Sequence, residues 1–481
     1  MFEASVIGAD TTLTGVSASS DQARPGDLFA GVPGHHAHGA RFAGQAVAAG
    51  AVAVLTDPAG RELVPPDVST MTVADVRGSL AAVAAEIYGR PSSAMNVVGI
   101  TGTSGKTTTT FLVRAGLEAA GRASGLIGTV ATFIGHEQVK TRFTTPEAPE
   151  LQAMLAVMLE RGVRDVAMEV SSHALTMRRV DNIDFSVAAF TNLSQDHLDF
   201  HHDMLEYFQA KARLFDGDAW PVIVIDDEWG LRLVDLVGEC TTVSATSGRG
   251  ATWTAREVEQ LPDGSTRFRA VGPGVEVVTG SAMPGRFNVA NALLALAILA
   301  QLGVTPLNDA GAAVAAACVP GRMERLDLGQ QFLAIVDYSH KPAAVESVLQ
   351  ALRPLTAKRL IVVLGCGGDR DRAKRPLMGE IAARGSDLLI VTDDNPRSEA
   401  PAAIRRAMLE GAGAVPVASR GEVREIGDRG DAIRAAVAAA APGDTVLVAG
   451  KGHEMGQEIE GVVYPFDDRE VLREAVRGVL Q

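Results

Sequence analysis

The chain has 481 residues, which is enough for about three domains of roughly 150 residues each. Apolar residues make up 47% and charged residues 21%, which is typical of a folded protein and excludes the collagen-like, disulfide-framework and disordered classes. Because 58 Asp and Glu outnumber 44 Lys and Arg, the net charge of −14 disfavours broad binding to nucleic acid or to an anionic membrane.

Compartment signals favour the cytoplasm. The three cysteines are too few for a disulfide framework and lack a metal-ligand spacing, which fits a reducing cytosol. Residues 1–10 contain no basic segment followed by an apolar core, so we expect no signal peptide. The longest uncharged stretch, 287–308, is interrupted by polar residues, Gly303 and Pro306, which predicts a buried helix ending near Gly303 and no membrane insertion.

Apolar runs of strand length alternate with helical patterns along the chain, which predicts the α/β class with parallel sheets. Turn-rich segments at 90–93 and 320–322 divide it into predicted domains at 1–92, 93–320 and 321–481. The clearest predicted strands are Asn96–Ile100, Asp165–Val170, Phe185–Phe190, Pro221–Ile225, Phe332–Val336, Arg359–Leu364, Asp387–Val391 and Thr445–Val448. Ligands of such sheets bind beyond the carboxyl ends of the strands, so functional residues are expected there.

The segment 101–107, Thr-Gly-Thr-Ser-Gly-Lys-Thr, lies between a predicted strand and a predicted helix. Its backbone N–H groups can hold phosphate, Lys106 can reach terminal phosphates and Thr107 can ligate Mg²⁺. It departs from the strict phosphate-loop pattern, because Ile100 stands where the first glycine is required. The alternative is a glycine turn with a solvated lysine, which the strand–loop–helix setting disfavours.

Two further strand ends carry possible magnesium ligands. Glu169 ends one predicted strand, and His197 follows another in the segment 191–199. A carboxylate and an imidazole there can complete magnesium coordination beside the phosphate loop, although each residue alone is more often structural. The histidines at 197, 201 and 202 could suggest zinc, but no cysteine or HExxH spacing accompanies them.

Lys211 lies in an amphipathic segment, 207–215, close to the face that carries Tyr207, Leu214 and Phe215. A lysine on an apolar face is unusual. From the residues alone, the default interpretation is a lysine that extends its amine to solvent.

Taken together, these motifs resemble those of the Mur ligases, the ATP-dependent enzymes that form peptide bonds in peptidoglycan synthesis. The resemblance covers essentially the whole chain. It rests on segments that follow the family's order: 101–107, 168–175 (MEVSSHAL), 191–201 (TNLSQDHLDFH), 210–215 (AKARLF), 284–295 (PGRFNVANALLA), 320–325 (PGRMER), 337–342 (DYSHKP), 365–379 (GCGGDRDRAKRPLMG), 394–397 (DNPR) and 450–454 (GKGHE).

The resemblance implies three α/β domains: a UDP-anchoring N-terminal domain, a central P-loop ATPase-like domain with a parallel sheet, and a C-terminal Rossmann-like domain that binds an amino acid. The implied reaction is ATP-dependent addition of meso-diaminopimelate to the D-Glu γ-carboxylate of UDP-MurNAc-L-Ala-D-Glu through an acyl phosphate. Implied cofactors are ATP, Mg²⁺ and CO₂, the last for carbamoylation of Lys211. A cytoplasmic monomer acting on small molecules, without nucleic acid, is expected.

The resemblance also implies roles for single residues. Metal ligands would be Thr107, Glu169, His197 and carbamoylated Lys211, and Arg322 would lie near the γ-phosphate. Asn288 and Asn291 would lie near adenine, Asp337 near the ribose, and Lys374 on the nucleotide. The expected ATP site comprises Gly102, Thr103, Ser104, Gly105, Lys106, Thr107, Thr108, Asn288, Asn291, Asp337 and Lys374, and the expected catalytic residues are Lys106, Lys211, Glu169, His197 and Arg322.

For the UDP-linked substrate, the segments 25–29 and 34–37 resemble the family's uridine-binding module. The implied contacts are Ala18, Ser20, His35, His36, Ala37, Thr144, Thr145, Ser171, Met177 and Arg179. Two positions depart from the family pattern: Asp21 stands where an arginine is usual, and Met177 stands where a glutamine often contacts substrate.

Residues 394–397 indicate the amino acid. In the family, DNPR accompanies enzymes that add meso-diaminopimelate, whose second carboxylate an arginine can bind in a bidentate way. The implied pocket comprises Arg370, Asp394, Asn395, Pro396, Arg397, Gly450 and Glu454. The local alternative is a turn whose arginine caps a helix or pairs with Glu399.

Three other functions remain open from the sequence. They are an L-Lys-adding ligase of the same family, a folylpolyglutamate synthetase, and a P-loop NTPase that acts as a switch or binding module. The uridine-type N-terminal segment argues against folate, and the 394–397 and 450–454 loops have no purpose in a simple switch.

Overall fold

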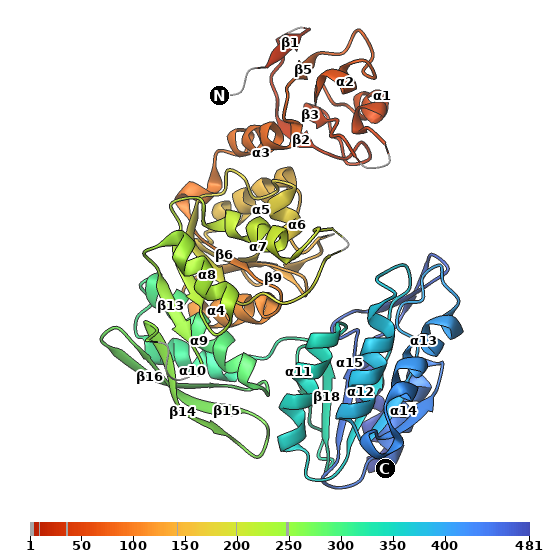
Figure 1. The fold of residues 1–481 in the computed structure, drawn as a ribbon. Coiled ribbons are helices and arrows are strands. Elements are labelled where there is room, and N and C mark those ends of the chain that lie inside the picture. Colours follow the sequence, from red (N-terminus) through yellow and green to blue (C-terminus); the bar gives the residue numbers. More distant parts are fainter. Residues whose placement is uncertain (1–3, 9, 35–36, 142, 199, 247–249) are drawn as a thin grey trace.

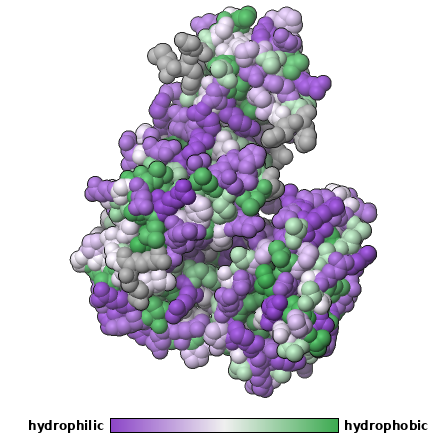
Figure 2. Space-filling view, viewed as in Figure 1, coloured by the Kyte–Doolittle hydropathy of each residue, from purple (hydrophilic) through white to green (hydrophobic). Residues whose placement is uncertain are grey.

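The computed structural model describes residues 4–8, 10–34, 37–141, 143–198, 200–246 and 250–481. Figure 1 shows an N-terminal, a central and a C-terminal part, each built around its own sheet, with the central part between the other two. On the face in Figure 2, hydrophilic side chains cover most of the surface and apolar ones form scattered patches. The α/β class predicted from the sequence is confirmed.

The N-terminal sheet has the order β1-β5-β4-β3-β2, in which β1 is antiparallel to β5 and the other neighbours are parallel. Its strands are β1 (Ser5–Ile7), β2 (Gly15–Ser17), β3 (Asp27–Ala30), β4 (Ala53–Thr56) and β5 (Thr70–Thr72). Its helices are η1 (Gly39–Phe42), α1 (Ala43–Ala48), α2 (Pro58–Arg61) and α3 (Val76–Ile87), and η2 (Pro91–Ala94) leads to the central part.

The central sheet has the order β16-β15-β14-β13-β12-β11-β6-β10-β7-β8-β9, parallel from β14 to β7 and antiparallel at both ends. Its strands are β6 (Asn96–Thr101), β7 (Ser124–Ile127), β8 (Thr132–Ile134), β9 (Glu137–Val139), β10 (Asp165–Glu169), β11 (Phe185–Phe190), β12 (Trp220–Val224), β13 (Thr241–Ser244), β14 (Trp253–Gln260), β15 (Thr266–Gly272) and β16 (Val275–Ser281). Its helices are α4 (Lys106–Ala119), α5 (Ala148–Glu160), α6 (Ser172–Thr176), α7 (Met204–Ala212), η3 (Arg213–Phe215), α8 (Glu228–Val237), α9 (Arg286–Gln301) and α10 (Leu307–Ala316).

The C-terminal sheet has the order β17-β18-β22-β19-β20-β21, parallel except for β17. Its strands are β17 (Glu324–Leu326), β18 (Leu333–Asp337), β19 (Leu360–Leu364), β20 (Leu388–Val391), β21 (Glu422–Glu425) and β22 (Thr445–Ala449), and a hairpin of β23 (Gly456–Ile459) and β24 (Val462–Pro465) follows. Its helices are α11 (Pro342–Leu352), η4 (Arg353–Leu355), α12 (Lys374–Gly385), α13 (Pro401–Ala414), η5 (Val417–Ser419), α14 (Arg429–Ala439) and α15 (Asp468–Leu480).

The strands predicted from the sequence are β6, β10, β11, β12, β18, β19, β20 and β22, each correct to within one residue at either end. Because β11, β6 and β10 are parallel neighbours, their carboxyl ends bring the phosphate loop, Glu169 and the segment after Phe190 to one edge of the sheet. The same rule places the loops after β18, β19, β20 and β22 at one edge of the C-terminal sheet.

Helix α9 is the buried helix predicted from the uncharged stretch. Residues 292–299 are each at most 1% exposed, and they pack with Leu112 and Leu117 of α4 in the largest apolar core. A helix that is apolar on all sides belongs inside a protein or a bilayer. No helix in the described part of the chain is long and apolar enough to cross a membrane.

Two glycines allow the first residue of the C-terminal part, just after the predicted junction, to lie close to the 450–454 loop. Gly321 and Gly452 both have left-handed backbones, with φ of 65° and 54°. A Cβ at Gly321 would lie 2.2 Å from the Gly452 carbonyl carbon, and a Cβ at Gly452 would lie 2.6 Å from the Gly321 oxygen. Glycine is therefore required on both sides of this contact.

Candidate active site

The loop between β6 and α4 is shaped for an anion. Gly102 and Gly105 adopt left-handed backbones, with φ of 143° and 89°. A Cβ at Gly102 would lie 1.9 Å from the Thr191 hydroxyl, so only glycine fits there. The loop leads directly into the first turn of α4, where unpaired backbone N–H groups favour phosphate.

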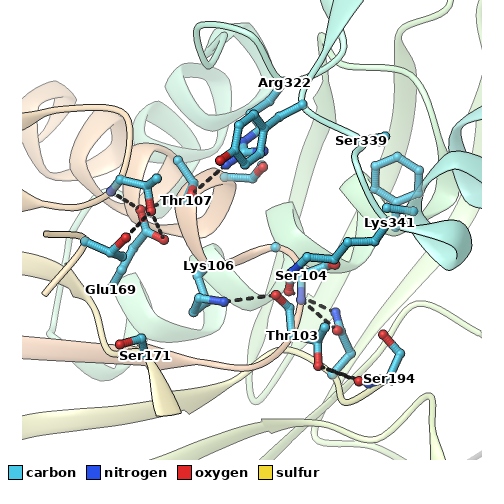
Figure 3. A pocket seen from close by; sticks show the side chains of 18 of the residues that line it. Thr103, Ser104, Lys106, Thr107, Glu169, Ser171, Ser194, Arg322, Ser339 and Lys341 are labelled. Atoms are coloured by element: carbon cyan, nitrogen blue, oxygen red, sulfur yellow. Dashed lines mark hydrogen bonds between the residues drawn. The ribbon is translucent and has the colours of Figure 1, made fainter. Parts of the chain in front are cut away.

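Lys106 lies over this loop. Its Nζ donates to the carbonyl oxygen of Gly102 at 2.8 Å. It also donates to the carbonyl oxygen of Thr103 at 2.9 Å (Figure 3). Burial lowers the pKa of Lys106 to about 8, helped by the nearby cations Lys341 and Arg322 and opposed by Glu169. A bound phosphate would supply the negative charge that this ammonium lacks.

Glu169, at the end of β10, is held by donors from two segments. Thr107 Oγ1 donates to its Oε1 at 3.0 Å, and the backbone N–H of Thr129 donates to the same oxygen at 2.7 Å. The Thr129 hydroxyl donates to Oε2 at 3.2 Å. Figure 3 shows Thr107 between Glu169 and Arg322, whose Nη2 lies 3.4 Å from the Thr107 hydroxyl.

These oxygens fit a magnesium site that is completed by a nucleotide. Mg²⁺ is usually held by one or two protein oxygens together with phosphate oxygens and water. Thr107 and Glu169 supply hard oxygen donors beside the phosphate loop. Within the described residues there is no group of three or more His, Cys, Asp or Glu that could hold a metal unaided.

His197 lies in the segment after β11 with a left-handed backbone, φ 53°. Its Nε2 is 3.0 Å from Asp196 Oδ2, and Lys341 of the C-terminal part forms an ion pair with the same carboxylate. Burial lowers the pKa of His197 to about 4, against the attraction of Asp196, so the imidazole is neutral at pH 7. The neutral imidazole is the form that can bind a metal.

Lys211 corrects one expectation from the sequence. Its side chain does not extend to solvent: the residue is 1% exposed, and its Nζ donates to the Gly102 carbonyl at 2.7 Å. The Nζ also lies 4.5 Å from the centre of the Tyr207 ring. Burial, with the charges of Lys106 and Lys341, keeps the pKa of Lys211 well below its usual value.

A cavity of about 900 Å³ joins these groups and is lined from both the central and the C-terminal parts. Expected ATP-site and metal residues on its wall are Thr103, Ser104, Gly105, Lys106, Thr107, Thr108, Glu169, His197, Asn288, Asn291, Arg322 and Asp337. Expected substrate residues on the same wall are Thr144, Thr145, Ser171, Met177 and Arg179. Lys374 instead donates to the backbone oxygen of His340, a lining residue, at 2.9 Å.

A second cavity, of about 940 Å³, lies between the N-terminal part and α5. Ala18 and Asp21 are on its wall, whereas Ser20 bonds to Gln45 at 3.1 Å outside the described lining. Phe143 lines both cavities, which therefore adjoin. His35 and His36 lie outside the described residues, and Ala37, just after them, is not among the residues described on this wall.

The expected amino-acid pocket forms a separate cluster at the edge of the C-terminal sheet. Asn395 Nδ2 donates to Glu454 Oε2 at 2.9 Å, and a Cβ at Gly450 would lie 2.7 Å from Asp394 Oδ2. Arg397 donates to the Gly368 carbonyl at 2.7 Å. Arg370 is exposed.

The predicted alternative for Arg397, pairing with Glu399, is wrong. Glu399 is bound by Arg375, whose Nη2 lies 2.8 Å from its Oε1, and by Arg372 at 3.3 Å. Arg397 pairs with Glu458 of β23 instead, at 3.2 Å.

Sequence reasoning missed several residues of these sites. Lys451 is fully buried and donates to Asn395 Oδ1 at 2.9 Å and to Glu454 Oε2 at 3.2 Å. Lys341 lines the cavity that holds the phosphate loop, and Thr129 holds Glu169. The lysines lie inside the 450–454 and 337–342 segments, which could have indicated them, whereas no sequence signal marks Thr129.

Comparison with known proteins decides the family. Models of the Mur ligase family match residues 12–88 ("Mur ligase family, catalytic domain"), 100–299 ("Mur ligase middle domain") and 321–452 ("Mur ligase, glutamate ligase domain"). A protein of Streptomyces avermitilis named UDP-N-acetylmuramoyl-L-alanyl-D-glutamate--2,6-diaminopimelate ligase is 53% identical over 97% of this chain and 93% of its own length. This chain belongs to the Mur ligase family.

Solved structures agree with this assignment. A structure of a UDP-N-acetylmuramoyl-L-alanyl-D-glutamate--2,6-diaminopimelate ligase is 31% identical, with a TM-score of 0.70 over 98% of this chain and 96% of that chain. A Mycobacterium tuberculosis folylpolyglutamate synthase complexed with ADP and AMPPCP is 19% identical, with a TM-score of 0.62 over 78% of this chain and 93% of that chain. The second likeness is one of fold alone.

The depressed pKa of Lys106 predicts a pH dependence of stability. A lysine whose pKa falls from about 10.4 in the unfolded chain to about 8 in the folded chain makes the unfolded state bind more protons between these values. The free energy of unfolding should therefore gain from this group as pH rises from about 8 to about 10. Urea unfolding followed by tryptophan fluorescence should show a smaller gain in Lys106→Met than in the wild type. An equal rise in the free energy of unfolding in the variant and the wild type would contradict a lowered pKa of Lys106.

Proposed function

We propose that this protein is an ATP-dependent ligase that joins meso-diaminopimelate to the D-Glu γ-carboxylate of UDP-MurNAc-L-Ala-D-Glu. The observation that carries the proposal is a single cavity lined both by the phosphate loop and by Thr145, Ser171 and Arg179. In the proposed reaction, these three residues would contact the UDP-linked substrate. The Streptomyces avermitilis relative, named for this reaction, supports it. Because it would use ATP and a nucleotide-linked substrate, we expect the ligase to act in the cytoplasm. We also expect it to act as a monomer.

The first step forms an acyl phosphate. A γ-carboxylate oxygen attacks the terminal phosphorus of ATP, the bond to the bridging oxygen breaks, and ADP leaves. Lys106 and Arg322 lie on either side of Thr107 and would stabilise the negative charge of the transferring phosphoryl group. Asn288 and Asn291 would contact the adenine, Asp337 the ribose, and Lys374 the nucleotide from the C-terminal part.

The second step forms the amide. The amine of the incoming amino acid attacks the acyl carbon, the bond to the phosphate oxygen breaks, and phosphate leaves as the nitrogen loses a proton. Without prior phosphorylation the carbon of the carboxylate would have to expel an oxide or hydroxide ion, which is a poor leaving group. The cavity must therefore hold nucleotide and substrate together. Arg179 is fixed for this by the Thr145 carbonyl at 3.1 Å and Glu147 at 2.7 Å.

Thr107, Glu169 and His197 would hold Mg²⁺. When bound, the ion neutralises phosphate charge and polarises the transferring group. The protein orients two of these ligands in advance: Thr129 fixes both oxygens of Glu169, and Asp196 contacts His197 through its Nε2. Thr145 Oγ1 donates to the Glu169 backbone oxygen at 2.9 Å, which joins the substrate side of the cavity to the metal side.

Lys211 is suited to carbamoylation. CO₂ reacts with a neutral amine: the nitrogen attacks its carbon, an N–C bond forms, and a proton is released to leave a carbamate anion. Burial and neighbouring cations favour the neutral amine of Lys211. The anion would place a negative charge beside Lys106, where the unmodified chain crowds positive groups.

The UDP end of the substrate would occupy the second cavity. The substrate would then extend from Ala18 in the second cavity to Thr144 in the first cavity. It would pass Phe143, which lines both cavities. Asp21, on this wall in place of the family's usual arginine, removes a cation from the diphosphate side.

The amino acid would bind in the C-terminal cluster. Arg397 would bind the second carboxylate of meso-diaminopimelate, while Asp394 and Glu454 would accept its ammonium groups. L-Lysine lacks that carboxylate and would leave Arg397 without this partner. Incubation with ATP, Mg²⁺, UDP-MurNAc-L-Ala-D-Glu and each amino acid, followed by mass measurement of the product, tests the proposal. A product with L-Lys alone would overturn the amino-acid assignment, and ATP turnover without any ligated product would favour an NTPase switch.

Removing the arginine should weaken use of the diacid. Loss of a desolvated carboxylate contact costs about 2–5 kcal/mol, so Arg397→Ala should lower kcat/KM for meso-diaminopimelate at least about tenfold. The KM for ATP should change little, because the cluster is separate from the ATP cavity. Arg384→Ala, at an exposed pair on α12, is the matched control. An Arg397→Ala enzyme with unchanged kcat/KM would contradict this role.

Replacing Lys211 separates the carbamate from a simple structural amine. We expect Lys211→Ala to lose ligation and to regain part of it with added short carboxylic acids, which can supply the missing anion. Lys211→Arg should be inactive, because a guanidinium forms no stable carbamate. Circular dichroism checks that both variants fold. An active Lys211→Arg enzyme would contradict carbamoylation.

A further inference from the structure

The Arg397 guanidinium already has a carboxylate partner in the protein itself. Its Nη1 donates to the Gly368 carbonyl at 2.7 Å, and its Nε lies 3.2 Å from Glu458 Oε2. Nε and Nη2 form the side edge of a guanidinium, which can bind both oxygens of one carboxylate. Glu458 therefore takes the Nε donor of the edge with which Arg397 would bind a substrate carboxylate in a bidentate way.

The backbone of Glu458 is fixed, whereas its carboxylate can leave. Its backbone N–H donates to Asn395 Oδ1 at 3.0 Å, and its carbonyl accepts from the Arg397 N–H at 3.0 Å. These bonds join β23 to the 394–397 loop. The Glu458 side chain is 40% exposed, so it can turn into water without desolvation or loss of the backbone pairing.

Lys451, Asn395 and Glu454 keep their arrangement when the Glu458 carboxylate moves away from Arg397. Lys451 donates to Asn395 Oδ1, the oxygen that also accepts from the Glu458 N–H. Because two donors occupy this oxygen, the Asn395 amide must present its NH₂ to Glu454, as the 2.9 Å contact requires. Movement of the Glu458 carboxylate alone leaves this arrangement intact.

We propose that Glu458 is an internal competitor for the Arg397 guanidinium and thereby sets the selectivity between diacid and monoacid substrates. This inference rests on the proposed function of the pocket. A diacid displaces the Glu458 carboxylate and takes its place on the arginine. A monoacid such as L-Lys leaves the pair of Arg397 and Glu458 intact. In the complex with L-Lys, Arg397 therefore keeps a carboxylate partner, and the enzyme discriminates less against L-Lys than it would without Glu458.

The test compares Glu458→Gln with the wild type in steady-state ligation of both amino acids. The variant keeps the size of the side chain but removes its charge. Its KM for meso-diaminopimelate should fall about threefold to tenfold, which corresponds to about 0.7–1.4 kcal/mol. Its kcat/KM for L-Lys should stay equal or fall, and its KM for ATP should stay unchanged. Selectivity for the diacid therefore rises.

Glu460→Gln is the matched control, because it removes the same charge from the turn of the same hairpin. Glu460 contacts Arg397 through its backbone N–H at 2.7 Å, which the substitution preserves. An unchanged or higher KM for meso-diaminopimelate in Glu458→Gln, or an equal fall in both variants, would overturn the inference. If the wild type does not use meso-diaminopimelate at all, the proposed function fails instead, and the product mass distinguishes that case.

Discussion

The carbonyl oxygen of Gly102 accepts hydrogen bonds from two lysines that come from different helices, the half-buried Lys106 of α4 and the buried Lys211 of α7. Two ammonium groups this close destabilise each other, and burial adds to the cost of their charge. The site is therefore built for negative charge that must come from elsewhere. In the proposed function, a bound phosphate supplies this negative charge beside Lys106, and a carbamate on Lys211 supplies it at the position of that amine.

The same constraint explains why the site lies between two parts of the chain. Arg322 and Lys341 reach the phosphate loop and Asp196 from the C-terminal side of the junction. The close contact of Gly321 with Gly452 joins that junction to the loop that carries Glu454. The groups proposed to bind nucleotide, substrate and amino acid are thus connected through a few short contacts, and the proposed amino-acid cluster is adjacent to the cavity without lining it.

The sequence predicted best what depends on local pattern. Strands β6 and β10 were recognised from apolar runs, and the parallel topology then placed Glu169 beside Thr107. The N-terminal strands were missed because three or four residues, as in β2, carry almost no periodic signal. Contacts between distant residues were also out of reach: Lys341 meets Asp196 across the two parts, and Arg397 pairs with Glu458 because a hairpin folds back along the loop. Lys211 was assigned correctly to an apolar face, but only the packing of α7 against the phosphate loop buries its amine.

In the proposed reaction, the cavity passes the terminal phosphoryl group of ATP to a carboxylate. UDP-MurNAc-L-Ala-D-Glu labelled with ¹⁸O in its γ-carboxylate, incubated with ATP, Mg²⁺ and meso-diaminopimelate, tests this directly by mass spectrometry of the inorganic phosphate. An acyl phosphate transfers one carboxylate oxygen to phosphate, so each ligation should release one phosphate that carries one ¹⁸O. Ligated product accompanied by unlabelled phosphate would contradict an acyl phosphate intermediate.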